Sequence, residues 1–401
     1  MRFEAFHRLE ERFFYALVGV GGLIVALGLL AAWHMEEHGH IVSGMNNQVV
    51  WGTPHIFAIF MIVAASGVLN VASIGSVFGK VPYKARAPLS GMLSLALLAG
   101  GLSVLMLDLG RPDRLIVAMT YFNFKSIFAW NVFLYTGLFA IVGVYLWTLM
   151  ERRMNVYSKY AGFVAFIWRL ALTTGTGSIF GFLVARQAYN SAVLAPAFIV
   201  MSFAWGLAAF IIVQSALFSW NNLTLHPDIL RRMKNLLGIF VAGALYFVAV
   251  HHLTNLYFAK QIDFEHFILV SGGIYPLLFW GGYVVLGSVL PLLLLYHPRL
   301  GAQCSSVITA SVLVILGAFA LLYVLIIGGQ AFPLEIFPGM EVRSSYLDGQ
   351  IDLYVPSVPE IFLGLGGLGV AFLITTIGVR VLHFVPQDDF SQLQGAGNIT
   401  D

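Results

Sequence analysis

Residues 56–79 read IFAIFMIVAASGVLNVASIGSVFG, twenty-four consecutive positions without a charged side chain. As an α-helix this stretch is about 36 Å long, and the hydrocarbon core of a bilayer is roughly 30 Å thick. Strands of membrane barrels alternate in polarity over about ten residues, whereas this stretch is longer and continuously apolar. It therefore predicts a transmembrane α-helix.

Stretches of the same kind recur along the 401 residues. Hydrophobic residues make up 59% of the chain and charged residues 10%, whereas soluble domains carry about 25% charged residues. Mean hydropathy is +0.86. The sequence thus predicts an all-α, polytopic membrane protein in which residues 1–401 form a single transmembrane domain. Its ten crossings are expected near 14–33, 56–79, 88–107, 127–150, 161–185, 194–218, 236–258, 276–296, 306–328 and 361–384.

Composition also excludes several kinds of site. With a single cysteine, Cys304, the chain cannot itself hold a cysteine-ligated iron–sulfur cluster, an intramolecular disulfide or a cysteine-rich zinc site. A formal net charge of +2 without a basic tract gives no sign of nucleic-acid binding. The first apolar stretch, Phe14 to Trp33, is long enough to span and lacks a cleavage-site pattern, so we expect it to be a retained helix.

The Lys and Arg residues are distributed unevenly between the connections. If the N-terminus is cytoplasmic, thirteen of the 21 lie in inner segments and six in outer loops, with Arg169 and Arg380 inside helices. The positive-inside rule then places both termini in the cytoplasm. We expect a multi-pass protein of the bacterial inner membrane, surrounded by the lipid bilayer.

Histidines gather at the outer ends of the expected helices. Ionisable groups at membrane depth are costly, so each is a functional candidate. Seven of the eleven histidines lie at or beyond these ends: His34, His38, His40, His55, His251, His252 and His266. The outer face is therefore the expected functional side.

The segment WGTPHIFAIF places Trp51 and His55 at the entry to the second helix, where Pro54 fits the first turn. A quinone headgroup needs hydrogen-bond donors and a proton acceptor at this depth, and an imidazole can serve as either. The alternative is that His55 and Trp51 only anchor the helix at the membrane interface.

The third helix is followed by LDLGRPDRL, in which Asp108 and Arg111 are expected to pair across a Gly-Pro turn. The pair would either tune a binding site or act as a structural clamp. Residues 115–126, which include Tyr121, resemble an irregular piece lining a cavity.

The fifth helix carries Arg169 and Thr173 within the membrane. A buried arginine needs a partner, and Asn70, Gln214 or a helix carbonyl are the candidates. Arg169, Thr173 and Asn70 would form either a proton path or a structural network.

The seventh helix ends VAVHHLTNLYFAK, so His251 and His252 point about 100° apart and Asn255 lies within a turn of both. One histidine should face the bundle. Glu360 lies in the first turn of the last helix, where it is expected to be a cap or a functional group. A b-type haem between His55 and His251 or His252 is the alternative considered; neither haem b nor a metal site is expected.

Four segments, in order, resemble the NrfD/PsrC-like membrane subunits of respiratory complexes in their ten-helix form. They are WGTPHIFAIF with IVAASG soon after, LDLGRPDRL, FGFLVARQAYNSAVLAPAF and YVPSVPEIF, and the resemblance covers nearly the whole chain. It implies a membrane subunit of a quinone-linked oxidoreductase complex without its own redox cofactor, which binds menaquinone or ubiquinone near the outer face. Electrons would pass between quinol and a periplasmic ferredoxin-like iron–sulfur subunit.

Within the family the sequence is most similar to the DsrP-type branch found in Dsr complexes of sulfur-metabolising prokaryotes. This similarity implies an iron–sulfur partner like DsrO, a multihaem cytochrome c like DsrJ, a haem b membrane subunit like DsrM and its cytoplasmic iron–sulfur partner like DsrK. Smaller family members place an asparagine and then a histidine a turn further into the second helix, where this chain has Thr53, His55 and apolar residues.

The resulting hypothesis is a quinone site in an outer cavity between the second, third, fifth and seventh helices. His55 and His251 or His252 would exchange protons with the quinone, with Asp108 and Arg111 setting their charge state. The remaining expected quinone contacts are Trp51, Tyr121, Arg186, Tyr189 and Asn255. The rival interpretations are a secondary transporter, a b-type haem-binding membrane anchor and a plain assembly anchor.

Overall fold

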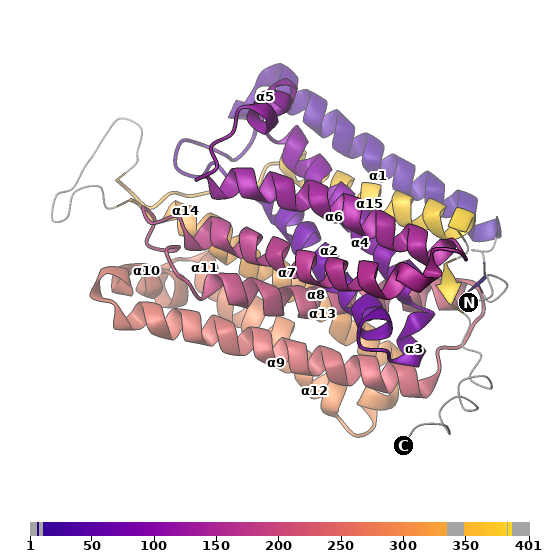
Figure 1. Ribbon diagram of the computed structural model, residues 1–401. Helices are drawn as coiled ribbons and strands as arrows, with labels where there is room; N and C mark the ends of the chain where they lie inside the picture. Colours follow the sequence, from indigo (N-terminus) through magenta and orange to yellow (C-terminus); the bar gives the residue numbers. More distant parts are fainter. Residues whose placement is uncertain (1–5, 8–10, 335–348, 383, 387–401) are drawn as a thin grey trace.

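The computed structural model describes residues 6–7, 11–334, 349–382 and 384–386. Within these residues ten helical segments are long and apolar enough to cross a membrane, which confirms the predicted polytopic all-α fold. They run roughly side by side as one bundle (Figure 1). The predicted cytoplasmic position of the two termini concerns residues outside the described part and stays a prediction.

Eight spans are regular α-helices: α1 (Glu11–His38), α2 (Thr53–Ser76), α4 (Ala87–Leu107), α6 (Ile127–Met150), α7 (Ser158–Gly181), α8 (Leu194–Trp220), α9 (Pro227–Tyr257) and α15 (Val358–Leu382). Two spans contain π-helix, in which each hydrogen bond reaches one residue further than in an α-helix. They are α11 (Ile274–Pro276) with π-helix η7 (Leu277–Val289) and α12 (Leu290–Tyr296), and α13 (Cys304–Leu322) with π-helix η9 (Tyr323–Gly328) and α14 (Gly329–Ala331).

Short elements connect the spans. They are 3-10 helix η2 (His40–Val42), α3 (Val81–Lys84), 3-10 helix η3 (Pro112–Arg114), α5 (Leu115–Thr120), 3-10 helix η4 (Asn155–Tyr157), 3-10 helix η5 (Ala259–Gln261), α10 (Ile262–His266), π-helix η6 (Phe267–Ser271) and 3-10 helix η8 (Leu300–Ala302). A two-residue antiparallel pair, β1 (Phe6–His7) with β2 (Val385–Pro386), joins early and late parts of the chain.

Most helix ends lie within a few residues of the predicted ones, and the largest difference concerns the seventh span. It begins at Pro227, nine residues before the predicted start at 236. Hydropathy marks only the apolar part, whereas the helix continues through the polar run DILRRMKN. Pro227 occupies the first helical position and His226 caps the helix by accepting a hydrogen bond from the Asp228 N–H.

Helix α2 is the centre of the bundle. It packs against α4, α7, α8, α13 and α15, and 94% of its apolar stretch is buried within the protein, against 17% for α1. Close approach to α8 depends on glycine: a Cβ built on Gly67 would lie 1.6 Å from the Ser202 carbonyl oxygen. Small residues of this kind are what allow membrane helices to pack backbone to backbone.

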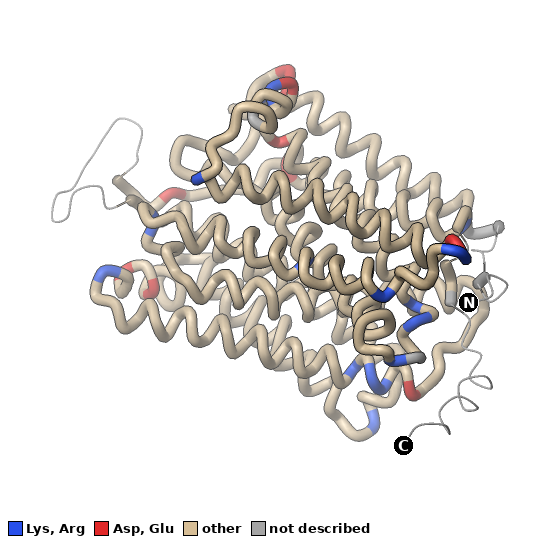
Figure 2. Tube along the Cα trace, viewed as in Figure 1, with Lys and Arg blue, Asp and Glu red and all other residues tan. Residues whose placement is uncertain are grey.

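Charged residues lie mostly toward the two ends of the bundle (Figure 2). One end, where α2 begins and α4 and α9 finish, carries His55, Asp108 and His252 and is called the histidine end below. The opposite end, where α2 finishes and α4, α7 and α9 begin, carries the arginines and lysines of the α2–α4 and α6–α7 connections and of the first turns of α9, and is called the basic end.

The α2–α8 contact can be tested with a single methyl group. Gly→Ala inside a helix ordinarily stabilises it by about 1 kcal/mol, but at Gly67 the added methyl meets the Ser202 backbone. We expect Gly67→Ala to lower the thermal unfolding temperature by several degrees. Gly143→Ala, where nothing lies within 4 Å of the new Cβ, is the matched control and should leave it unchanged or raise it. Equal stability of the two variants would contradict this packing.

Candidate functional site

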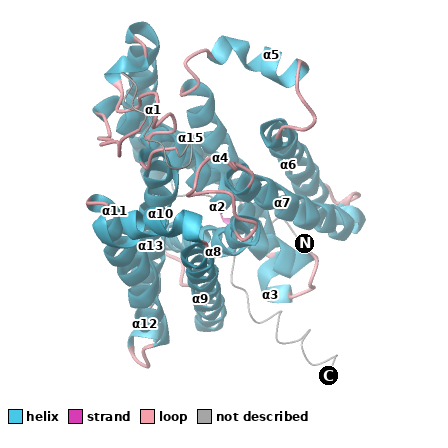
Figure 3. Ribbon diagram, turned by 90° about the vertical axis from the view of Figure 1, so that its left-hand side faces the viewer, coloured by secondary structure: helices cyan, strands magenta, loops and turns pink. Residues whose placement is uncertain are grey.

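His55 and Asp108 meet at the histidine end, which Figure 3 views end-on with α5 on one side and α10 and α11 on the other. Gly52 caps α2 and Pro54 lies in its first turn, so His55 starts the span with its side chain near the membrane surface. Asp108 is the residue after the last turn of α4. Because α2 and α4 pack along their length, the two side chains come together.

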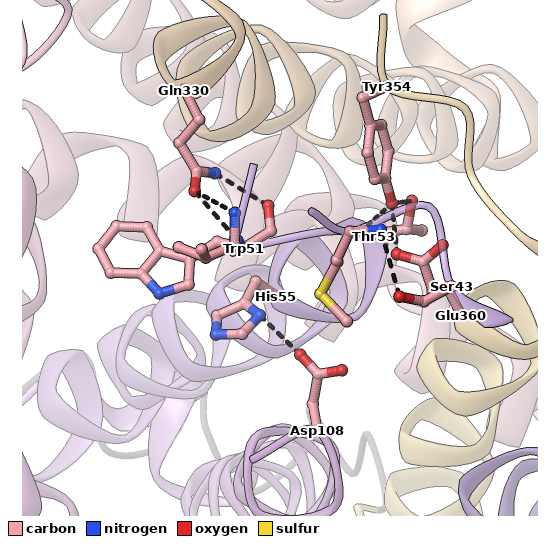
Figure 4. Close-up of polar contacts among 10 residues, drawn as sticks. Ser43, Trp51, Thr53, His55, Asp108, Gln330, Tyr354 and Glu360 are labelled. Atoms are coloured by element: carbon pink, nitrogen blue, oxygen red, sulfur yellow. Dashed lines mark hydrogen bonds and ion pairs between the residues drawn. The ribbon is translucent and has the colours of Figure 1, made fainter. Parts of the chain in front are cut away.

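The His55 Nδ1 atom lies 2.8 Å from Asp108 Oδ2 (Figure 4). The carboxylate is 1% exposed and the imidazole 17% exposed. At this distance the two groups would form an ion pair when the imidazole is protonated, but they are not aligned for a regular hydrogen bond, so both Asp108 oxygens lack a hydrogen-bond partner among the described residues. A buried carboxylate in this condition needs a proton, a cation or a ligand donor.

A cavity of about 390 Å³ lies beside this pair, between the α1–α2 connection and the end of α4. Asp108 forms part of its wall, together with His40, Met45 and Val50. His40 Nδ1 is also buried without a hydrogen-bond partner in the described structure. The cavity therefore brings apolar surface and two unsatisfied polar groups together, as expected of a ligand site.

Trp51 covers His55 from the other side. Its ring lies 6.0 Å from the imidazole, at 25° between the ring planes, and it also contacts Phe128 and Phe180 edge-on. Gln330 in α14 fixes this segment: its Oε1 accepts from the N–H groups of Val50 and Trp51, and its Nε2 donates to the Trp51 carbonyl. The segment beside His55 is thus held in place by a residue 279 positions after Trp51 in the sequence.

Arg186 and Tyr189 also fix the position of the Trp51 segment. The Arg186 guanidinium donates to the Gln330 and Gln48 carbonyls, each at 2.9 Å, and the Tyr189 hydroxyl donates to the Ile326 carbonyl. Burial lowers the pKa of Arg186 and raises the pKa of Tyr189. Both side chains are committed to backbone carbonyls, so their observed contacts position the Trp51 segment.

A second group of hydrogen bonds, called the Tyr354 frame below, joins the start of α2 to the start of α15. The Tyr354 hydroxyl donates to Glu360 Oε1 at 2.6 Å and accepts from the Thr53 N–H at 2.7 Å. Glu360 Oε2 accepts from the N–H groups of Gly44 and Ser357, so the carboxylate both caps α15 and anchors the α1–α2 connection (Figure 4). Burial, with the hydrogen bond to Glu360, raises the pKa of Tyr354, which therefore keeps its proton.

The second group of histidines forms a separate cluster. His252 Nδ1 lies 2.7 Å from Glu265 Oε2, and Asn255 Nδ2 donates to Glu265 Oε1 at 2.7 Å. His251 contacts Ser191 and Asn255 at 3.3 and 3.4 Å. Glu265 is fully buried in α10, and His251 and His252 line a small, mainly apolar cavity away from His55.

Arg169 is buried in the membrane interior with polar partners. Its guanidinium donates to Asn70 Oδ1 at 2.7 Å and contacts the Ser66 carbonyl at 3.4 Å. The Thr173 hydroxyl lies 2.6 Å from the Ser66 hydroxyl and donates to the Arg169 carbonyl. The three expected residues are therefore connected, by a network that links α2 to α7.

Similarity to known proteins extends over most of the chain. A family model described as polysulphide reductase, NrfD, matches residues 41–334. The chain belongs to the NrfD family. The matched segment contains both histidine clusters and Arg169, whereas Tyr354 and Glu360 lie beyond it.

Several known proteins are similar to this chain over most of their length. An Hdr-like menaquinol oxidoreductase integral membrane subunit from Archaeoglobus fulgidus is 28% identical over 93% of this chain and 94% of its own. A putative membrane subunit of a dimethyl sulfoxide reductase from Halobacterium salinarum is 28% identical, over 91% and 90%. A polysulfide reductase chain from Wolinella succinogenes is 22% identical, over 71% and 96%.

One sequence prediction about contacts is wrong. Arg111 does not pair with Asp108; it pairs with Asp113 at 3.1 Å, and this hydrogen bond lowers the pKa of Asp113. Asp108 turns instead toward α2, where the helix packing brings it to His55. Of the three candidate partners for Arg169, Asn70 and a helix carbonyl are confirmed, and Gln214 binds Arg86 instead.

The predicted single cavity is also wrong in part. Asp108, the neighbour of His55, lines one cavity, whereas His251 and His252 line another. Tyr121 is 86% exposed on the α5–α6 connection and lines neither of them.

Gln330, Tyr354 and the partner role of Glu265 were not predicted from the sequence. Gln330 carried a signal: it is the first amide after a long apolar run that ends in two glycines, a place where a polar side chain must find partners. Tyr354 gave no comparable sign, because its partner Thr53 lies 301 positions away.

The Tyr354 frame can be tested by removing one oxygen. Tyr354→Phe leaves buried Glu360 and Thr53 without a shared partner, and each unpaired group costs about 1–3 kcal/mol. We expect a clearly lower unfolding temperature in the purified protein. Tyr121→Phe, at an 86% exposed position, is the control and should leave it unchanged. An unchanged Tyr354→Phe protein would show that the frame contributes nothing to stability.

Proposed function

We propose that this chain is the quinone-interacting membrane subunit of a multi-subunit electron-transfer complex, with His55 and Asp108 as its proton-exchanging groups. The observation that carries the proposal is the buried carboxylate at 2.8 Å from an imidazole, unsatisfied and open to a cavity of about 390 Å³. Membership of the NrfD family and similarity to a menaquinol oxidoreductase subunit support it.

Quinol oxidation releases two electrons and two protons, so the site must accept protons as electrons leave. Asp108 occupies the Nδ1 side of His55, which leaves Nε2 for a quinol hydroxyl. A proton taken by Nε2 makes an imidazolium, which the Asp108 carboxylate beside it stabilises. In quinone reduction the same pair would give the proton back. Menaquinone or ubiquinone would be the exchangeable substrate.

Other predicted residues take different parts in this proposal. Trp51 would pack against the quinone ring, and Arg186 and Tyr189 would hold the Trp51 segment through their carbonyl contacts. His251, His252 and Asn255 would supply a second proton-accepting group through Glu265. Arg111 and Tyr121, both on exposed connections, would contribute only where a partner subunit or a lipid covers them.

Electrons would leave through a partner subunit, because the chain has too few cysteines for a cluster of its own. We propose that a ferredoxin-like iron–sulfur subunit docks on the histidine end, above His55, and that this end faces the periplasm of a bacterial inner membrane. The proposed setting is dissimilatory sulfur metabolism, with DsrO-, DsrJ-, DsrM- and DsrK-like partners. The similarity to other NrfD-family reductase subunits supports the multi-subunit setting.

The central prediction concerns His55→Gln and Asp108→Asn. Each keeps the shape of its side chain but removes proton exchange or the stabilising charge, and general acid–base groups contribute about 10²–10⁴-fold to rate. We expect quinol-driven electron transfer by the purified complex to fall at least about 10²-fold. His266→Gln, on the exposed part of the same end, is the control and should retain activity.

A measurement of inhibitor binding distinguishes this proposal from a role in assembly alone. A hydroxyquinoline N-oxide inhibitor, whose fluorescence is quenched at quinone sites, should bind the wild-type complex and the His266→Gln control. It should bind Asp108→Asn and His55→Gln complexes more weakly, although their subunits still co-purify. Normal turnover and normal inhibitor binding in both variants would remove His55 and Asp108 from the mechanism.

The proposed proton path through Arg169, Thr173 and Asn70 makes a separate prediction. An Asn70→Leu, Arg169→Leu double variant removes the charge together with its partner, so no buried charge is left unpaired. We expect this complex to assemble but to turn over several-fold more slowly in sealed vesicles. Unaltered turnover would leave the network a purely structural role.

A further inference from the structure

A cavity of about 530 Å³ lies at the basic end, far from the histidine clusters. It is enclosed by the end of α2, by α3, by the end of α6 and by the start of α7. A water molecule occupies roughly 30 Å³ in the liquid, so this cavity has room for a polar group much larger than a few waters.

Two lysine side chains, those of Lys84 and Lys159, line the cavity. Lys84 is the last residue of α3 and Lys159 the second residue of α7, and both are exposed. Across the described ranges, neither ammonium group makes an ion pair or a hydrogen bond. The acidic residue of the neighbouring connection, Glu151, accepts a hydrogen bond from the Arg153 N–H. The cavity is therefore positively charged and selects for an anion.

The remaining polar wall favours the same charge. Asn155 and Ser158 line the cavity where the 24-residue helix α7 begins, and the N-terminus of a helix carries partial positive charge. The Ser158 hydroxyl donates to the Asn155 carbonyl, and the Ser76 hydroxyl pairs with Tyr145. The hydroxyls are thus satisfied within the protein, and the two lysines are left to bind a ligand.

The surroundings of the cavity are apolar and exposed. Phe78, which lines it, is 60% exposed. Trp147 and Tyr160, close to lining positions in the sequence, are 54% and 70% exposed, and Phe163 on α7 is 52% exposed. In a membrane-spanning helix such surfaces contact acyl chains. A ligand with an anionic headgroup and apolar chains would match both parts of the wall.

We infer that this cavity binds the phosphate headgroup of an anionic glycerophospholipid, with Lys84 and Lys159 on the phosphate and the acyl chains along α6 and α7. Basic pockets between membrane helices bind anionic headgroups through this combination of charge and depth. The site is separate from the proposed quinone chemistry and does not depend on it.

The test uses the purified full-length chain and phosphatidylglycerol. Lipid retained by the protein is counted by native mass spectrometry, and affinity is measured by titration of the unfolding temperature. Each lysine beside an anionic headgroup contributes a factor of about five in affinity, so Lys84→Gln with Lys159→Gln should weaken binding about 30-fold. Lys125→Gln with Lys260→Gln, the same change of charge at the histidine end, should bind as the wild type does.

Two further measurements separate lipid from other ligands. The charge-preserving double variant, Lys84→Arg with Lys159→Arg, should retain phosphatidylglycerol. Each single Gln variant should bind phosphatidylglycerol about 5-fold more weakly than the wild type. The single variants provide the result if the double Gln variant cannot be purified. Equal affinity of wild type and the Gln variants would overturn the proposal. So would equal stabilisation by phosphatidylcholine, or equally tight binding of soluble glycerol 1-phosphate, which would make the site one for a free phosphate.

Discussion

The absence of water in the bilayer core is the constraint on which this structure depends, since each polar group at that depth must find a partner inside the protein. Among the described spans, helix α2 is the most deeply buried, with 94% of its apolar stretch inside the protein. Its polar groups therefore depend on partners from the helices around it. Its Gly67 lets α8 approach to backbone contact, and its Ser66 carbonyl and Asn70 side chain accept hydrogen bonds from the two terminal nitrogens of the Arg169 guanidinium on α7. The helix that carries His55 at its end is therefore among the most firmly held in the bundle.

The same constraint explains why the unsatisfied groups are informative. Around His55 hydrogen bonds fix the backbone: Gln330 holds the Trp51 segment, and Tyr354 and Glu360 hold the start of α2. Within this rigid surrounding the Asp108 oxygens are left without a hydrogen-bond partner in the described structure, beside a cavity. A buried carboxylate that is held rigidly but has no permanent hydrogen-bond partner suits a site where a ligand binds and leaves.

The sequence could predict the features that depend on neighbouring residues. Apolar length sets the ten spans, and Pro54 marks where α2 begins, so His55 could be placed at a membrane surface. Contacts between distant segments could not be predicted in this way. The nearest arginine in sequence suggested a partner for Asp108, whereas the true neighbour comes from α2 through helix packing. The π-helical turns of η7 and η9 were missed because hydropathy does not depend on whether a hydrogen bond skips four residues or five.

The separation of the two histidine–carboxylate pairs bears on the proposed proton chemistry. If quinol is oxidised beside His55, the first proton is taken close to Asp108, and a second positive charge there would repel it. His252 and Glu265 form another pair at the same end but in a different cavity, with Glu265 fully buried between α9 and α10. Two sites set apart can each hold a proton without that repulsion. A division of the predicted single pocket into two is thus compatible with a two-proton reaction, in which the Asp108 cavity is bounded by the α1–α2 connection and the end of α4, and the His252 cavity lies apart from it.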